Sequence, residues 1–277
     1  MGGGRLRGAD LHVPYHGVRH PSGEELTLQD RCAAFQLRMP QRAFFNSVTA
    51  ARLLSVPLPL RLERGPDLHV AVPTPTRALN ARGIIGHKVT LIGDDYSWRS
   101  GLRVSSPRRT WCDLSTVLSL PELVAAGDFI VHWRLPMCTI ADLASAISQF
   151  RGRRGMPALK TALGLLNNRA ESPKESELRV IITLAGLVGF EINFPIMAGG
   201  YRYRGDIAFP REKVLLEYLG DHHRSPEQWR RDVARATRVR AEGWFIFEFT
   251  DADLQNPGEL VRCIRAILMQ RAGGSLL

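Results

Sequence analysis

The chain of 277 residues is long enough for two ordinary domains, and its 44% hydrophobic and 23% charged residues exclude a mainly disordered protein. Its 37 Lys and Arg outnumber 27 Asp and Glu, and the resulting formal charge of +10 favours polyanionic partners such as nucleic acid. Genomic base content can produce the same Arg-rich composition, so charge alone leaves the partner open.

The first half of the chain predicts helices, then a small sheet, then further helices. Residues 26–39 have helical apolar spacing, and Ser47 or Thr49 can cap a short helix at 50–54. Strands are indicated by β-branched runs between Gly, Pro and Asp, at 68–73, 87–92 and 101–107. Amphipathic helices follow at 108–118, 120–133 and 139–150. We expect an N-terminal α+β domain, for which a winged-helix-like binding module is one candidate among many folds.

The Arg- and Gly-rich segment 151–160 is the best linker candidate, although a basic loop that touches phosphate would have the same composition. The expected domains are therefore 1–150 and 151–277. In the second, the predicted order is helix, three strands, helix, strand and helix, at 172–188, 190–196, 202–209, 213–219, 226–242, 244–250 and 257–271. This order predicts an α/β protein with a mixed sheet flanked by helices.

Two acidic residues lie where a hairpin would bring them together. If the turn is centred between Arg211 and Glu212, Asp206 lies directly opposite Glu217, with Cβ atoms about 5 Å apart. Two carboxylates about 4 Å apart repel by roughly 4 kcal/mol at an effective dielectric of 20, so a proton or a cation is needed between them. We expect Asp206 and Glu217 to bind Mg²⁺, with Mn²⁺ as an alternative, because such an ion can activate water for phosphodiester hydrolysis.

Two histidines follow this hairpin. Gly220 permits a turn that presents His222 and His223, and either imidazole can exchange a proton with water or with the leaving oxygen. Adjacent histidines are more often surface residues, and it is the carboxylates just upstream that make this pair a candidate. Strand alternation puts Lys213 on the Glu217 face, where a solvated lysine is the favoured interpretation.

The helix predicted at 226–242 has clear boundaries. Ser225 and Gln228 have capping-box spacing, and Gly243 follows the end. One face carries Arg231, Arg235 and Arg238, which can follow a phosphate backbone; a solvated helix face is an equal alternative. Trp229 and Val233 are expected to face the sheet.

Five segments in the second half carry a resemblance to a known family: SPKESELR (172–179), RGDIAFP (204–210), KVLLEYLGDHHR (213–224), QWRRD (228–232) and EGWFIFEFTDADL (242–254). In this order they resemble the endonuclease-like domains related to very-short-patch repair endonucleases, within the PD-(D/E)xK superfamily. The resemblance covers about residues 170–270 and implies a restriction-endonuclease-like fold. It also implies a metal-binding role for Asp206, a second acidic position at Glu217, and at Glu175 a helical acid that orients metal-bound water. His222 or His223 matches the histidine region, and the expected framework residues are Trp229, Asp232 and Trp244.

One position departs from the family. The superfamily lysine two residues after the second acid is replaced by Leu219, where related domains often carry an aspartate. Either the histidines or Lys213 compensate, or the domain is a catalytically inactive DNA-binding version. Residues 15–135, with RAFFNSVTAARLLSVPLP and GLRVSSPRRTWCDL, look like the N-terminal part of actinobacterial proteins grouped with abortive-infection antitoxins. That likeness implies a regulatory or targeting module.

The sequence therefore predicts a metal-dependent endonuclease that acts on DNA in repair or defence. The alternatives are a catalytically inactive DNA-binding regulator or antitoxin, and a nuclease directed at RNA. The four cysteines lie far apart without a CxxC pair, which argues against a zinc ribbon and a disulfide framework. No apolar run reaches 18 residues and no signal-peptide core is visible, so we expect a cytoplasmic protein.

Overall fold

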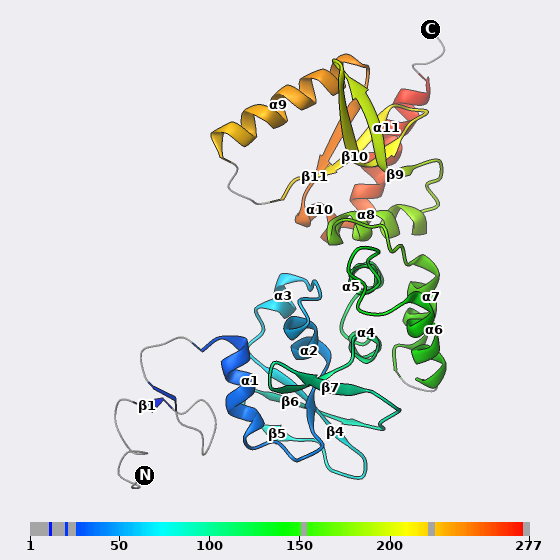
Figure 1. Ribbon diagram of the computed structural model, residues 1–277. Coiled ribbons are helices and arrows are strands. Elements are labelled where there is room, and N and C mark those ends of the chain that lie inside the picture. Colours follow the sequence, from blue (N-terminus) through cyan, green and yellow to red (C-terminus); the bar gives the residue numbers. More distant parts are fainter. Residues whose placement is uncertain (1–10, 13–19, 22–25, 151–153, 221–224, 274–277) are drawn as a thin grey trace. The chain divides into compact units, whose positions relative to one another are not determined.

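The computed structural model describes residues 11–12, 20–21, 26–150, 154–220 and 225–273, which form two compact units (Figure 1). The units are Met1–Arg169 and Ala170–Leu277. The division falls after helix α7 (Met156–Leu165) and not at 150–151, because α7 packs against α5 (Leu120–Ile130) and α6 (Ile140–Gln149) of the N-terminal unit. Each unit is a mixed sheet flanked by helices, as the α/β prediction requires.

The N-terminal unit has a six-stranded sheet that is larger than the predicted one. In the spatial order β5-β6-β4-β3-β8-β7, β4 is parallel to β6, and β3 is parallel to β8. Its strands are β3 (Phe44–Phe45), β4 (Leu68–Pro73), β5 (Asn80–Ala81), β6 (Ile84–Val89), β7 (Tyr96–Arg99) and β8 (Leu102–Ser105). The three predicted strand runs become β4, β6 and β8. The added strands make the unit larger than a winged-helix-like module.

Five helices of this unit lie close to their predicted positions: α1 (Leu28–Gln36), α2 (Ser47–Leu53), α4 (Pro107–Leu114), α5 and α6. Helices α3 (Leu60–Glu63) and α7 were not predicted, and α7 begins inside the segment 151–160 that was predicted to be a linker. A separate two-stranded ladder joins β1 (Leu11–His12) to β2 (His20–Pro21). The N-cap of α2 is Asn46, and neither Ser47 nor Thr49 has that role. Thr49 is buried and its hydroxyl instead accepts a hydrogen bond from the His69 backbone N–H, at 2.7 Å.

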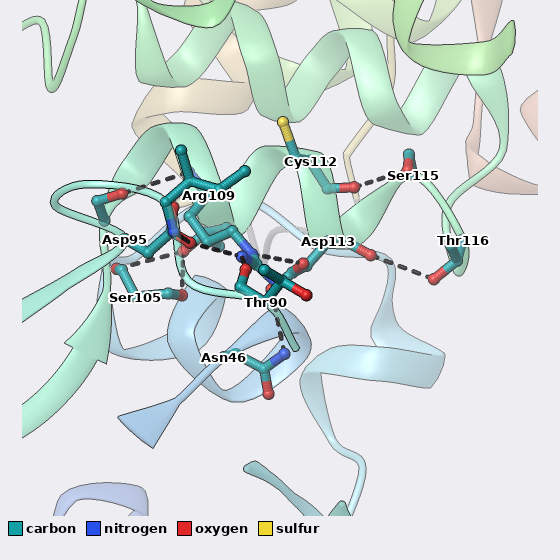
Figure 2. A network of polar contacts seen from close by, with 12 residues as sticks. Asn46, Thr90, Asp95, Ser105, Arg109, Cys112, Asp113, Ser115 and Thr116 are labelled. Atoms are coloured by element: carbon teal, nitrogen blue, oxygen red, sulfur yellow. Dashed lines mark hydrogen bonds and ion pairs between the residues drawn. The ribbon is translucent and has the colours of Figure 1, made fainter. Parts of the chain in front are cut away.

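A buried ionic network joins α4 to the rest of this unit (Figure 2). Arg109, which is 4% exposed, donates to Asp95 at 2.7 Å and to Asp113 at 2.9 Å. Asn46 donates to the Asp113 carboxylate at 3.1 Å. Burial raises the pKa of Asp113, and the neighbouring Arg109 opposes that rise. Each of the two carboxylates has a hydrogen-bonding partner within the network, so we interpret the network as structural.

The C-terminal unit contains every predicted element in the predicted order, and it also has one short helix, Asp251–Gln255, that was not predicted. It contains α8 (Pro173–Leu184), β9 (Glu191–Ala198), β10 (Tyr201–Phe209), β11 (Val214–Tyr218), α9 (Pro226–Ala241), β12 (Phe245–Phe249), α10 (Asp251–Gln255) and α11 (Pro257–Gly273). The sheet order is β12-β11-β10-β9, with β9, β10 and β11 antiparallel and β12 parallel to β11. Helix α8 ends earlier than predicted, ahead of Gly186, which has a φ of 73°.

Two apolar layers cover the two faces of this sheet. On one face, α8 and α11 pack on β10 and β11 through residues such as Leu178, Ile264 and Leu216. On the other face, the C-terminal half of α9 packs through Val239 against Leu215. Strand alternation sends Leu215 and Leu216 to opposite faces. None of the helices in the described ranges is long and apolar enough to cross a lipid bilayer.

Candidate functional site

Along strands β9 and β10, side chains alternate between the two faces of the sheet. This alternation reverses at one shared position, formed by Asn193 and Asp206. On one side of it, Ile192 and Ile207 are partners and pack with α8 and α11. On the other side, Phe194, the partner of Gly205, packs with α9 and Trp244. Residues two apart on a regular strand would share a face. The left-handed backbone of Asn193, with a φ of 54°, accommodates the change.

Gly205, next to this position, permits the Leu215 side chain to lie close to the backbone of β10. A Cβ added at Gly205 would overlap the Leu215 side chain on the neighbouring strand. The part of the β9–β10 hairpin nearer its tip packs against α9. There, the Gly199 N–H contacts the Glu242 carboxylate at 3.4 Å. Asp206 therefore lies where the β9–β10 hairpin turns toward α9.

The register of the β10–β11 hairpin agrees with the sequence prediction. The ladder consists of the pairs Phe209–Val214, Ala208–Leu215 and Ile207–Leu216, and one step further in this register is Asp206 opposite Glu217. The Tyr218 backbone N–H donates to the Asp206 carboxylate at 3.2 Å. Burial raises the pKa of Asp206, and the charge of Glu217 adds to the rise, while the Tyr218 N–H and Arg235 oppose it. The two acids are thus brought together as predicted.

Glu175, in the first turn of α8, joins the same site. Its side chain is 3% exposed and accepts from Asn193 Nδ2 and from the Glu171 backbone N–H, both at 3.2 Å. Burial raises the pKa of Glu175 to about 7, with a smaller contribution from the charge of Asp206. At neutral pH this carboxyl group can therefore both accept and release a proton.

Arg235 supplies the positive charge that the pair of carboxylates needs. Its guanidinium binds both oxygens of Glu217, with Nη1 2.9 Å from Oε2, and also donates to the Arg204 carbonyl at 3.1 Å. The side chains of Arg235 and Glu217 are 27% and 17% exposed. The charge of Arg235 thus opposes the effect that the charge of Glu217 has on Asp206.

The arginines predicted to form one phosphate-binding row on α9 have different environments. Arg238 donates to the Tyr203 hydroxyl at 3.0 Å and lies over the Tyr201 ring, 4.7 Å from its centroid. Arg231 is exposed and bonds only the Glu227 carbonyl among the described residues, at 3.3 Å. Arg235 and Arg238 contact residues of the sheet. Of the three arginines, only Arg231 is therefore as solvated as a phosphate-binding row on the helix surface requires.

The prediction that Trp229 and Val233 face the sheet is wrong. These side chains are 58% and 45% exposed. The apolar contact of α9 is made one to two turns later, by Ala236 and Val239. Ser225 does cap the helix, by accepting from the Gln228 N–H at 3.2 Å, and Gly243 ends it with a φ of 84°.

Among the expected substitutes for the family lysine, Lys213 has a partner outside the acidic site. Lys213 Nζ donates to the Glu242 carbonyl at the end of α9, at 2.9 Å, and so caps that helix. Leu219 N–H continues the sheet by donating to the Phe249 carbonyl at 2.7 Å. The candidates His222 and His223 lie outside the described residues.

Glu248 is an acidic residue that the sequence interpretation missed. It pairs with Glu217 across the parallel β11–β12 ladder, so Asp206, Glu217 and Glu248 occupy one row across three strands. Its position between Phe247 and Phe249, as an acid within an apolar strand, was the available signal. Within the described part of the chain, no group of three or more His, Cys, Asp or Glu side chains is arranged to hold a metal ion.

Comparisons with known proteins show relatives without an assigned activity. Two proteins from two strains of Mycobacterium tuberculosis, each described as uncharacterized, are 28% identical to the chain over 263 residues. The match covers 92% of this chain and 92% of each relative, so the similarity extends over both units. No family model and no solved structure matches the chain.

Proposed function

We propose that the C-terminal unit has a restriction-endonuclease-like fold and is a metal-dependent endonuclease that hydrolyses DNA phosphodiester bonds. The observation that carries the proposal is that the charge of Asp206 acts on Glu175, from α8, and the charge of Glu217, from β11, acts on Asp206, next to the position where β9 and β10 change face. The order of elements, one helix, three strands, one helix and one strand, supports the fold. Burying acids together is unfavourable for stability, which favours a functional reason for their placement.

The residues of the site suggest how they would act. Glu175, with a pKa of about 7, exchanges a proton with the attacking water, while Asn193 holds its carboxyl group in place. The Tyr218 N–H orients Asp206. Arg235, which links Glu217 to the Arg204 carbonyl, can offer its guanidinium to a phosphate oxygen when it leaves Glu217.

The donor set suits a hard divalent cation, because Asp206 and Glu217 provide carboxylate oxygens. When bound there, Mg²⁺ or Mn²⁺ would activate water and offset charge on the leaving oxygen. Both oxygens of Glu217 accept hydrogen bonds from Arg235, so a cation bound to this carboxylate would share it with the guanidinium or displace the guanidinium.

The test is cleavage of plasmid DNA with Mg²⁺ or Mn²⁺ by the full chain and by Asp206→Asn, Glu217→Gln and Glu175→Gln. We expect Asp206→Asn and Glu217→Gln to abolish cutting, and Glu175→Gln to lower its rate. Glu191→Gln, which changes an exposed acid on β9, is the matched control. Cutting that survives both Asp206→Asn and Glu217→Gln would reject this assignment. Parallel assays on RNA decide between the two nucleic acids.

A second candidate is a catalytically inactive DNA-binding regulator or antitoxin. It is favoured by the Arg235–Glu217 ion pair, in which the chain itself supplies a cationic partner for Glu217, and by Leu219 in place of a polar residue. Salt-sensitive DNA binding without any metal-dependent cutting would select this function. In either case, we propose that the N-terminal unit contributes target choice or regulation.

A further inference from the structure

An open hollow lies on the hairpin beside the acidic site. It has a volume of about 400 Å³ and is lined by Asn193, Pro195, Arg202, Tyr203 and Arg204. Asn193 belongs to both places, since its side chain also donates to Glu175. A group bound in the hollow would therefore lie next to the carboxylates.

The hollow is basic. Arg202 and Arg204 are two residues apart on β10, so their side chains share one face and start about 7 Å apart. Arg204 is held by a two-pronged ion pair with Glu171. Arg202 is exposed, and no acidic side chain in the described ranges pairs with it. One guanidinium is thus fixed by a carboxylate, and the other is available to an external anion.

The surface around Arg202 continues with apolar groups. Pro195 is exposed on β9 opposite Arg204, and Met197, opposite Arg202, is 62% exposed. A guanidinium with apolar side chains next to it suits a ligand that alternates anionic and apolar parts. A nucleic-acid strand has this character, since phosphates alternate with sugars and bases.

We propose that this hollow is the strand-binding subsite of the C-terminal unit, in which Arg202 binds a backbone phosphate of DNA and positions the strand beside Glu175. The inference rests on the proposed function for the identity of the strand. Arg202 is a positioning residue, because it acts on a phosphate next to the site and not on the reacting atoms.

The experiment measures binding of a short duplex DNA to the full chain in EDTA, over a series of salt concentrations. Loss of one phosphate contact lowers the slope of log affinity against log salt by about 0.9, which corresponds to a loss of roughly eightfold at 0.1 M salt. We expect this change for Arg202→Ala. Arg202→Lys keeps the charge and should restore most of the slope.

Arg211→Ala is the matched control, because Arg211 is an exposed arginine beyond the other end of β10. Equal thermal stability of the variants checks folding. Binding by Arg202→Ala that equals wild-type binding, or an equal loss in Arg211→Ala, would overturn the proposal. A cleavage assay distinguishes the proposed nuclease function from the proposed subsite. Cutting that requires Asp206 but not Arg202 would support the nuclease function and reject the subsite. Arg202-dependent binding without cutting leaves the subsite and removes the nuclease function.

Discussion

Replacement of Arg235 by Gln is the sharpest probe of the acidic site. The change removes the cation that binds both oxygens of Glu217, in a pair whose side chains are 27% and 17% exposed. A charged group left largely buried without its partner costs about 1–3 kcal/mol. We therefore expect Arg235→Gln to lower the free energy of unfolding of the C-terminal unit by roughly that amount in EDTA.

The same variant should respond more strongly to a divalent cation. With Arg235 gone, Mg²⁺ or Mn²⁺ no longer competes with a guanidinium for Glu217, so added cation should restore part of the lost stability by binding the folded state. The wild-type chain should gain less at the same cation concentration. This comparison measures cation binding without relying on catalysis.

The assay is urea unfolding followed by circular dichroism and tryptophan fluorescence, with isothermal titration of Mn²⁺ into each folded variant. Arg231→Gln, one turn earlier on α9 and exposed, is the control and should leave stability unchanged. A cycle with Glu217→Gln isolates the pair, because the double variant should lose much less than the sum of the single losses. Wild-type stability of Arg235→Gln in EDTA, or additive losses in the cycle, would refute the reasoning.

Three further predictions concern the surroundings of this pair. The pKa of Glu175 is raised from 4.5 to about 7 in the folded state, so the wild-type chain should lose up to about 3 kcal/mol of stability relative to Glu175→Gln as pH rises from about 4.5 to 7. The test is urea unfolding over that pH range, and parallel curves would contradict the prediction. Gly205→Ala should destabilise the unit by about 1–3 kcal/mol, because the new Cβ meets the Leu215 side chain in the core. Thermal unfolding checks this loss, and Gly258→Ala, which meets nothing within 4 Å, is its control. Leu219→Asp adds a carboxylate two residues after Glu217 and should raise the affinity for Mn²⁺, as measured by titration; an unchanged affinity would count against a cation site there.

Local patterns determined much of the C-terminal unit. The predicted elements from 172 to 271 lie within a few residues of the observed ones, because each has its own periodicity, cap or turn. The opposition of Asp206 and Glu217 was also predictable, since a short turn and strict alternation set the register of a hairpin. The pairing of two acids is therefore encoded within a dozen neighbouring residues.

The partners of those acids were decided by the tertiary structure. Arg235 meets Glu217 because α9 packs on one face of the sheet through its C-terminal half, and the same packing leaves Trp229 exposed. Asn193 meets Glu175 only because two strands change face together at a left-handed residue. Alternation within one strand cannot reveal such a change, since it depends on how the strand fits its neighbours. The sequence by itself determined that two acids would lie opposite each other on a hairpin. Long-range packing determined that the Arg235 guanidinium, the Asn193 amide and the hollow lie beside them.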